Sequence, residues 1–163
     1  MAAELELFAD YHQIHVQDEE SEDDLGEAWT DQTVSDGIAV ADGLLGIGTA
    51  VNVTVAVRVD VLTAEPTAGD LADFDHVVEA GLEAPSGQVV VMGCSDFFDD
   101  AARFDVPEGW IRVRASRRNL AAAVAADIDS GTSPETMEQV RLQIWPAPQA
   151  AARVLKRWER AGV

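Results

Sequence analysis

The chain has 163 residues, of which 47% are hydrophobic, and carries a formal net charge of −19. This length supports one domain with a sizeable core, and the hydrophobic content excludes a wholly disordered chain. Its single cysteine, Cys94, permits no internal disulfide, and no apolar run approaches the roughly 20 residues of a membrane span. The first ten residues carry acids where a signal peptide needs basic residues. We therefore expect a soluble, cytoplasmic protein that does not enter a membrane.

The negative charge is unevenly distributed along the chain. Residues 1–50 contain 13 acidic residues and no Lys or Arg, whereas residues 101–163 contain 7 acidic against 10 basic residues. Such an acidic front repels phosphates, so direct binding of nucleic acid is not expected, and it attracts a basic protein. The alternative is that the charge serves solubility alone, as it does throughout acidic proteomes; a single Lys against ten Arg suggests a GC-rich genome.

The chain begins with a predicted strand over 4–16, which leads into an acidic loop over 17–28. The loop has seven acidic residues between Asp18 and Glu27, without the alternating ligands and the central Gly of a calcium loop. A run of like charges faces solvent, where it is available to a basic partner. The candidate partner-binding residues are Asp18, Glu19, Glu20, Glu22, Asp23, Asp24 and Asp31.

A short helix is predicted after the acidic loop. Thr30 or Asp31 can cap a helix over Gln32–Ala41, in which Val34 and Ile38 recur at helical spacing and would pack on a sheet. The glycine-rich run that follows, GLLGIGTA, indicates a strand with a bend or bulge.

The stretch Val51–Leu62, VNVTVAVRVDVL, is the clearest secondary-structure signal in the chain. Valine occupies every second position from 51 to 61, which places all six valines on one face of a strand and mostly polar residues on the other. A helix would scatter these β-branched residues around its circumference. We therefore predict a long strand whose valine face is buried.

Two strand pairs are predicted beyond this strand. A Pro-Ser-Gly turn separates His76–Ala84 from Gln88–Cys94, and a Pro-Glu-Gly turn separates Ala102–Val106 from Trp110–Ala115. Both turns favour hairpins.

The C-terminal third contains a helical run, RRNLAAAVAAD, and a last strand over 140–145 that prolines terminate. In the tail, about 149–162, the apolar residues lie on one helical face, which predicts an amphipathic helix docked on the domain. A helix that binds a partner or a second copy of the chain is the alternative, so a homodimer stays open. Seven or eight short strands predict a mainly β fold: a single-domain antiparallel β-sandwich with one or two short helices and this C-terminal helix.

No catalytic or metal-binding signature is present in the sequence. His12 and His15 would face opposite sides of a strand, and Cys94 has no cysteine partner, so we expect no zinc site from these residues and His76. We predict no cofactor and no enzymatic activity; the scattered carboxylates leave a hydrolase as an alternative, because sequence cannot show their separation.

Four short motifs resemble a known family. Tyr11-His12-Gln13 in an opening strand, Trp29-Thr30-Asp31, Ala41-Asp42-Gly43 before a strand, and the segment 103–110 with its Pro-x-Gly turn and terminal Trp are similar to the competence protein J family. The resemblance covers residues 9–116 and leaves the acidic loop, the RRNLAAA segment and the basic tail without a counterpart. It implies a shared fold and the inhibition of a DNA-entry nuclease, but no residue roles; we interpret Tyr11, His12 and Trp29 as fold-defining.

The sequence therefore leaves two main hypotheses. The first is a non-enzymatic binding module, a nuclease inhibitor or immunity-like protein that presents an acidic, DNA-mimicking face to a basic partner. The second is a scaffolding domain whose acidity is only a matter of solubility.

Overall fold

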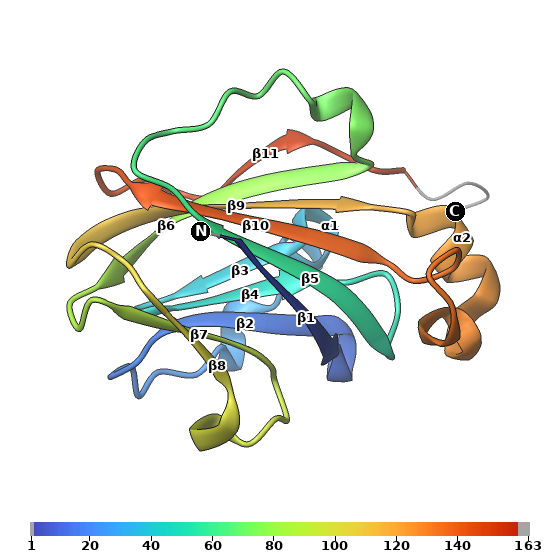
Figure 1. Cartoon of the computed structure of the whole chain (residues 1–163), viewed down its shortest axis with the longest axis horizontal. Coiled ribbons are helices and arrows are strands. Elements are labelled where there is room, and N and C mark those ends of the chain that lie inside the picture. Colours follow the sequence, from blue (N-terminus) through green and yellow to red (C-terminus); the bar gives the residue numbers. More distant parts are fainter. Residues whose placement is uncertain (1, 160–163) are drawn as a thin grey trace.

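The computed structural model describes residues 2–159, which form two β-sheets packed face to face (Figure 1). The six-stranded sheet contains, in spatial order, β1 (Ala2–Phe8), β5 (Thr54–Val61), β10 (Gln139–Pro146), β9 (Gly109–Arg118), β6 (His76–Ala84) and β11 (Arg153–Lys156). The five-stranded sheet contains β3 (Ile38–Ala41), β4 (Leu44–Gly48), β2 (Gln13–Asp18), β7 (Gln88–Gly93) and β8 (Ala102–Asp105). Two short helices, α1 (Asp31–Asp36) and α2 (Leu120–Ala126), complete a fold that confirms the predicted mainly β sandwich.

Strand β5 has the buried valine face that the sequence predicts. Val55, Val57 and Val59 are at most 2% exposed and lie in the core between the sheets, whereas Arg58 faces outward and is exposed. The strand begins at Thr54 rather than Val51, because the chain bends over 51–53. Its neighbours are β1, which is antiparallel, and β10, which is parallel, so the six-stranded sheet is mixed rather than wholly antiparallel.

The two predicted hairpins are wrong, although their strands and turns are present. β6 pairs with β9 and β11, and β7 pairs with β2 and β8, so the Pro-Ser-Gly turn carries the chain from one sheet to the other. The Pro-Glu-Gly turn carries it back from β8 to β9. Turn residues specify a reversal of direction, but they do not specify whether the flanking strands pair with each other or cover each other across a core.

The N-terminal strand and the first helix are both shorter than the sequence predicts. The strand expected over 4–16 is divided by a 3-10 turn, η1 (Asp10–His12), so β1 and β2 lie in different sheets. Thr30 caps α1 as expected, but the helix ends at Gly37, which has the left-handed φ of 78°. The predicted helical residues 38–41 form β3 instead.

The predicted C-terminal helix is wrong over its described residues, 149–159. Arg153–Lys156 forms β11, which pairs antiparallel with β6 and covers an edge that would otherwise be open. The backbone N–H of Gly81 donates to the carbonyl of Ala150 at 3.0 Å, and an added Cβ at Gly81 would lie 2.8 Å from the Ala150 nitrogen. Main-chain pairing with β6 thus overrides the helical spacing of the tail; residues 160–162 lie outside the described part.

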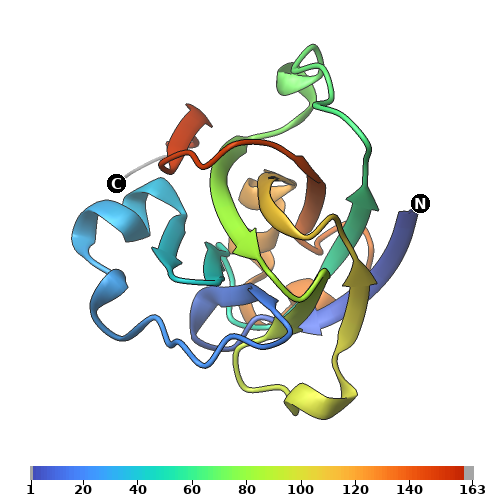
Figure 2. The same ribbon diagram turned by 90° about the vertical axis from the view of Figure 1, so that its left-hand side faces the viewer.

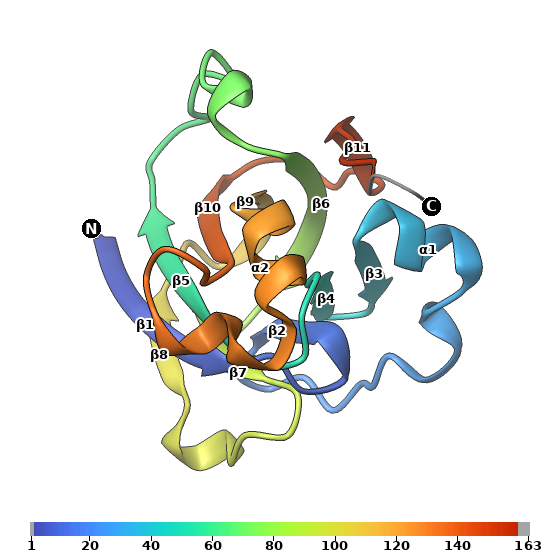
Figure 3. The same cartoon turned by 90° about the vertical axis from the view of Figure 1, so that its right-hand side faces the viewer.

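The two ends of the sandwich are closed differently. Figure 3 shows α2 lying across one end, where Leu120 and Ala123 are buried. Figure 2 shows the opposite side of the molecule, with β11 beside β6 and α1 near the C-terminal segment. Arg157 connects these last two elements, because its guanidinium donates to the Asp36 carboxylate at 2.6 Å and to the Ser35 carbonyl at 2.8 Å.

The carboxylate of Glu79 on β6 joins the tail to the six-stranded sheet. It is 2% exposed and accepts hydrogen bonds from Arg114 at 2.9 Å and Arg153 at 3.1 Å. We predict that Glu79→Gln lowers the free energy of unfolding by about 3 kcal/mol, because it leaves the buried Arg114 with only the exposed Glu65 carboxylate, at 3.8 Å, as a counter-charge. Urea denaturation measures this, with Glu83→Gln, which changes an exposed carboxylate on the same face of β6, as the control. Equal stability of the two variants would show that this ion cluster does not hold the tail.

Candidate functional site: the acidic surface of the five-stranded sheet

The charge of the protein is divided between its two layers. Residues 10–53 and 86–108, which build the five-stranded sheet and its loops, contain 16 acidic residues and one basic residue, Arg103. The rest of the chain contains 14 acidic and 10 basic residues. The five-stranded half therefore carries a formal charge of −15 out of −19, and it is the strongest candidate for a binding surface.

Most of the basic residues that the structure describes in the other half form ion pairs within the molecule. The pairs include Arg58 with Asp60, Arg114 with Glu79, Arg117 with Glu138, Arg141 with Asp70, and Arg157 with Asp36. The guanidinium of Arg141 holds the pKa of Asp70 below its usual value, as Arg157 does for Asp36. The cationic C-terminal third is thus largely neutralised by local carboxylates.

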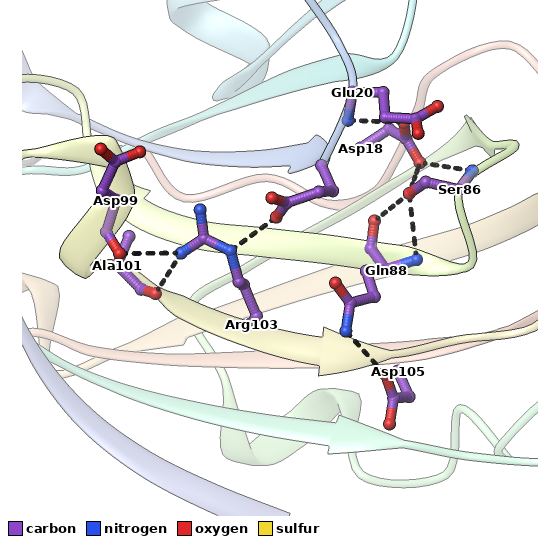
Figure 4. Close-up of polar contacts among 9 residues, drawn as sticks. Asp18, Glu20, Ser86, Gln88, Asp99, Ala101, Arg103 and Asp105 are labelled. Atoms are coloured by element: carbon purple, nitrogen blue, oxygen red, sulfur yellow. Dashed lines mark hydrogen bonds and ion pairs between the residues drawn. The ribbon is translucent and has the colours of Figure 1, made fainter.

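The acidic loop 17–28 is anchored by its first carboxylate, Asp18, which is 2% exposed (Figure 4). One carboxylate oxygen accepts hydrogen bonds from the hydroxyl of Ser86 at 2.7 Å and its N–H at 3.2 Å, and the other accepts from the Glu20 N–H at 3.0 Å. Asp18 thus ties the loop to the turn between β6 and β7. The sequence predicts Asp18 as a partner-binding residue, but its carboxylate is already hydrogen-bonded within the protein.

Glu19 is engaged with the single cation of this half. Its carboxylate accepts a hydrogen bond from Arg103 on β8 at 2.6 Å, and the same guanidinium donates to the Ala101 carbonyl at 2.8 Å (Figure 4). Arg103 also lies over the Phe98 ring, 4.9 Å from its centroid. The acidic loop and the β7–β8 connection are consequently joined through one arginine.

Apolar packing fixes the remainder of the loop against the outer face of the five-stranded sheet. Leu25, which is 6% exposed, forms a small cluster with Ala39 and Leu44, and Trp29 packs against it. The Trp29 indole donates to the Gln13 side chain at 3.0 Å. An added Cβ at Gly46 would lie 2.5 Å from Leu25, so this close approach requires glycine.

The anchored loop displays the remaining predicted carboxylates to solvent. Glu20, Glu22, Asp23, Asp24 and Asp31 are exposed, and among residues 2–159 no Lys or Arg side chain forms an ion pair with them. Unpaired carboxylates on an anchored backbone form a preorganised anionic surface, which loses little conformational entropy on binding.

A second acidic segment extends this surface and was missed as a site by sequence reasoning. The connection between β7 and β8 contains the 3-10 turn η4 (Phe98–Asp100), and it exposes Asp96, Asp99 and Asp100. Arg103 links it to Glu19, so it continues the acidic loop. The signal in the sequence is the run SDFFDD, which is distant from the loop in sequence and is linked to it in the fold through Arg103.

The histidines and the cysteine occupy separate places. His15 on β2 bonds Gln13 at 2.8 Å, and burial lowers its pKa; the Cys94 thiol donates to the Asp10 carbonyl at 3.2 Å, and burial raises its pKa. His12 is exposed on η1. Within the described chain no group of three His, Cys, Asp or Glu side chains is arranged to hold a metal, and the absence of a zinc site stays a prediction.

Residues 6–138 match the model of the competence protein J (ComJ) family. The chain belongs to the competence protein J family. This confirms the resemblance that the four sequence motifs carry. None of the curated protein sequences matches the chain, and none of the helices within residues 2–159 is long and apolar enough to cross a membrane.

Two solved structures share the ComJ fold of this chain. One is ComJ from Bacillus subtilis, described as the inhibitor of the DNA-degrading activity of NucA, with a TM-score of 0.66 and 16% identity over 89% of this chain and 96% of that chain. The other is described as crocagin biosynthetic gene J, with a TM-score of 0.63 and 16% identity over 91% and 98%. At this identity the likeness shows the fold alone.

The anchoring role of Asp18 gives a first prediction for this surface. Asp18→Ala removes the acceptor of two backbone N–H groups and leaves the Ser86 hydroxyl with only the Gln88 carbonyl, so we expect a loss of about 2 kcal/mol in unfolding free energy and faster proteolysis within 18–28. Asp23→Ala, which removes an exposed carboxylate from the same loop, is the control. Chemical denaturation and digestion with a Glu-specific protease measure both effects; equal digestion rates would contradict an anchoring role.

His76 gives a second prediction, because both of its ring nitrogens are bonded. One contacts the Asp36 carbonyl at 2.6 Å and the other accepts from the Trp158 N–H at 3.0 Å. Burial, followed by the nearby Arg117, lowers the pKa of His76 from 6.5 to about 4. Between pH 6.5 and pH 4, the His76 imidazole is therefore protonated in the unfolded chain and neutral in the folded protein. The stability that neutral His76 contributes is complete above pH 6.5 and is lost as the pH falls toward 4.

The measurement is the unfolding free energy of wild type and His76→Gln between pH 7 and pH 4. The stability difference between them should shrink by about 3 kcal/mol over this range, at 1.36 kcal/mol per pKa unit. His12→Gln on the exposed η1 turn is the control. A wild-type-to-His76→Gln difference that is constant with pH would contradict the buried neutral histidine.

Proposed function

We propose that this protein is a non-enzymatic inhibitor of a nuclease, and that it binds the basic DNA-binding surface of that enzyme through the acidic surface of its five-stranded sheet. The observation that carries the proposal is the concentration of 16 acidic residues against one arginine in this half of a ComJ-family fold. The Bacillus subtilis protein that shares the fold is described as an inhibitor of a DNA-degrading activity.

Electrostatic complementarity supplies the physical basis of such inhibition. A nuclease that holds DNA presents cationic side chains to phosphates, and the exposed carboxylates of Glu20, Glu22, Asp23 and Asp24 present the same sign of charge in a closely spaced series. Complementary surfaces raise the association rate by steering the encounter. Occupation of the groove blocks DNA, so the inhibitor needs no chemistry of its own.

The distribution of the charge favours this role over solubility alone. A charge that serves only to keep the protein soluble has no reason to separate by layer. The six-stranded half nevertheless pairs most of its cations with its own acids, and the five-stranded half leaves most of its acids exposed. The mutual repulsion of these carboxylates destabilises the isolated protein slightly, and a basic partner would relieve it.

Direct assay of inhibition tests the proposal. The immobilised protein captures partners from a lysate of its host, and each captured protein is purified and assayed for degradation of DNA with and without added inhibitor. We expect a captured nuclease whose activity falls to background at a stoichiometric amount of the protein. The proposal is wrong if no captured protein degrades DNA, or if degradation is unchanged at saturation.

A charge-neutralised variant tests the acidic surface itself. In Glu20→Gln/Glu22→Gln/Asp23→Asn/Asp24→Asn, association with the captured nuclease should slow by about 10-fold or more at low salt, because steering supplies that much. Dissociation should change less, and the effect should shrink at high salt.

The matched control removes the same charge from the other half. Glu6→Gln/Glu83→Gln/Asp73→Asn/Asp129→Asn changes four exposed carboxylates outside the five-stranded half. Stopped-flow binding at two salt concentrations compares the variants. An equal slowing by both would assign the effect to net charge rather than to this surface, and no slowing by either would overturn the electrostatic model.

A further inference from the structure

Three exposed aromatic side chains belong to neighbouring segments of the chain, one of which carries the second acidic segment. Phe8, Tyr11 and Phe97 are 47%, 74% and 68% exposed, and they are the only aromatic members among the large hydrophobic side chains that residues 2–159 leave exposed. We call these three residues the aromatic tip. They come from two segments, the end of β1 with η1 and the β7–β8 connection, which Gly93, Cys94 and Ser95 bring side by side through their contacts with Phe8 and Asp10.

Hydrogen bonds through Asp10 hold the two segments of the aromatic tip together. Its carboxylate accepts from the Ser95 hydroxyl at 2.7 Å, and its carbonyl accepts from the Cys94 thiol at 3.2 Å. Gly93 approaches the backbone of Phe8 so closely that any Cβ would clash with the Phe8 carbonyl. The Gly93 N–H donates to the Asp96 carboxylate at 2.8 Å, which fixes the turn that precedes Phe97.

The backbone beneath Tyr11 is strained. Tyr11 and His12 have φ values of 56° and 58°, a left-handed conformation that bulky residues rarely adopt. The turn is nevertheless held, because the His12 N–H donates to the Ala9 carbonyl at 3.1 Å and the Thr49 N–H donates to the His12 carbonyl at 2.9 Å. The sequence hypothesis that Tyr11 and His12 define the fold does not explain these exposed side chains, whereas Trp29 is packed. Strain that the surroundings maintain at an exposed residue is typical of functional sites.

The surroundings of the aromatic tip determine which ligand suits it. Exposed carboxylates of Asp96, Asp99 and Asp100 flank Phe97. The adjacent ring, Phe98, already carries the Arg103 guanidinium at 4.9 Å from its centroid. An aromatic face bordered by carboxylates binds a cation by both cation–π and ionic attraction, and arginine satisfies both.

We propose that the aromatic tip is the short-range anchor for a basic, arginine-bearing surface of the partner protein, while the acidic loop guides the approach. The inference rests on the proposed function and names a second part of the same surface. Aromatic residues dominate the binding energy of interfaces when they are buried by the partner, and they act mainly on dissociation. Charge on the rim acts mainly on association.

Other occupants of the aromatic tip conflict with its charge. Exposed rings can stack on the bases of single-stranded nucleic acid, but such proteins combine their rings with a positive groove, and here the neighbours are Asp96, Asp99 and Asp100. An anionic membrane is repelled for the same reason. A second copy of the chain would bring these carboxylates against one another.

A single fluorine label reports on the tip without mutation, because Tyr11 is the only tyrosine in the chain. Protein labelled with 3-fluorotyrosine gives one fluorine resonance, which we expect to shift or broaden when the captured nuclease is added. A matched titration with single-stranded DNA should leave the resonance unchanged. Nuclease binding that leaves it unchanged, or a shift with DNA, would overturn the inference.

Substitutions in the aromatic tip distinguish an effect on partner binding from an effect on the stability of the fold. Tyr11→Asn places in the left-handed turn a residue that tolerates it, so the melting temperature should not fall. Tyr11→Asn/Phe97→Ser should increase dissociation of the nuclease about 10-fold or more and change association by less than about 3-fold. Ile128→Ser, which removes a 74% exposed side chain of η5 (Asp127–Thr132) in the other half, is the control and should change neither rate.

The outcomes distinguish the two proposals. If the double variant dissociates as slowly as wild type while inhibition persists, the aromatic anchor is wrong and the proposed function stands. If wild type neither binds nor inhibits a nuclease, both fail. A double variant whose melting temperature falls is replaced by Phe97→Ser alone, for which faster dissociation supports the anchor and an unchanged rate overturns it.

Discussion

The period-two valines of β5 are the constraint from which the architecture follows. Val55, Val57 and Val59 must leave water together, and one face of a sheet can be buried only by a second layer. The neighbouring strands β1 and β10 also turn alternate apolar residues inward, so they too require a second layer to bury them. The chain buries these faces by crossing between the layers four times: at η1, over residues 49–53, and at each of the two Pro-x-Gly turns. The strands on either side of each crossing therefore lie in opposite sheets. The five-stranded sheet supplies the loops of the proposed binding surface.

Local sequence patterns predicted the elements of this fold better than their pairing. The alternation in β5 and β10 and the alanine-rich run of α2 depend on side chains a few residues apart, so they are readable from one segment. Pairing depends on distant partners. The tail illustrates the difference: its apolar residues have helical spacing, but the open edge of β6 and the Glu79 carboxylate select an extended chain. Nothing within 149–159 reveals that edge or that carboxylate.

The candidate surface was predictable to a similar degree. The run of acids after β2 was visible in the sequence, and most of its carboxylates are exposed as expected. The sequence could not show that Asp18 turns inward to Ser86, or that Glu19 is occupied by Arg103, since these partners are 68 and 84 residues away. Nor could it show that Tyr11 and Phe97 emerge beside each other's segment, because the contact of Asp10 with Ser95 forms only in the folded chain. Identical acidic residues in one loop thus have different roles, set by long-range contacts.

The separation of charge between the layers gives the molecule a large electric dipole moment, directed from the five-stranded to the six-stranded sheet. Within residues 2–159, nine of the ten basic residues belong to the six-stranded half, and most unpaired acids belong to the five-stranded half. In the field of a cationic body, such a dipole experiences a torque as well as an attraction, so rotational diffusion is biased before any atoms touch. The protein would therefore reach a positively charged surface, whether an enzyme or an anion-exchange resin, already turned with the same side forward. The placement of the arginines therefore affects the orientation in which the protein approaches such a surface, and not only its affinity for it.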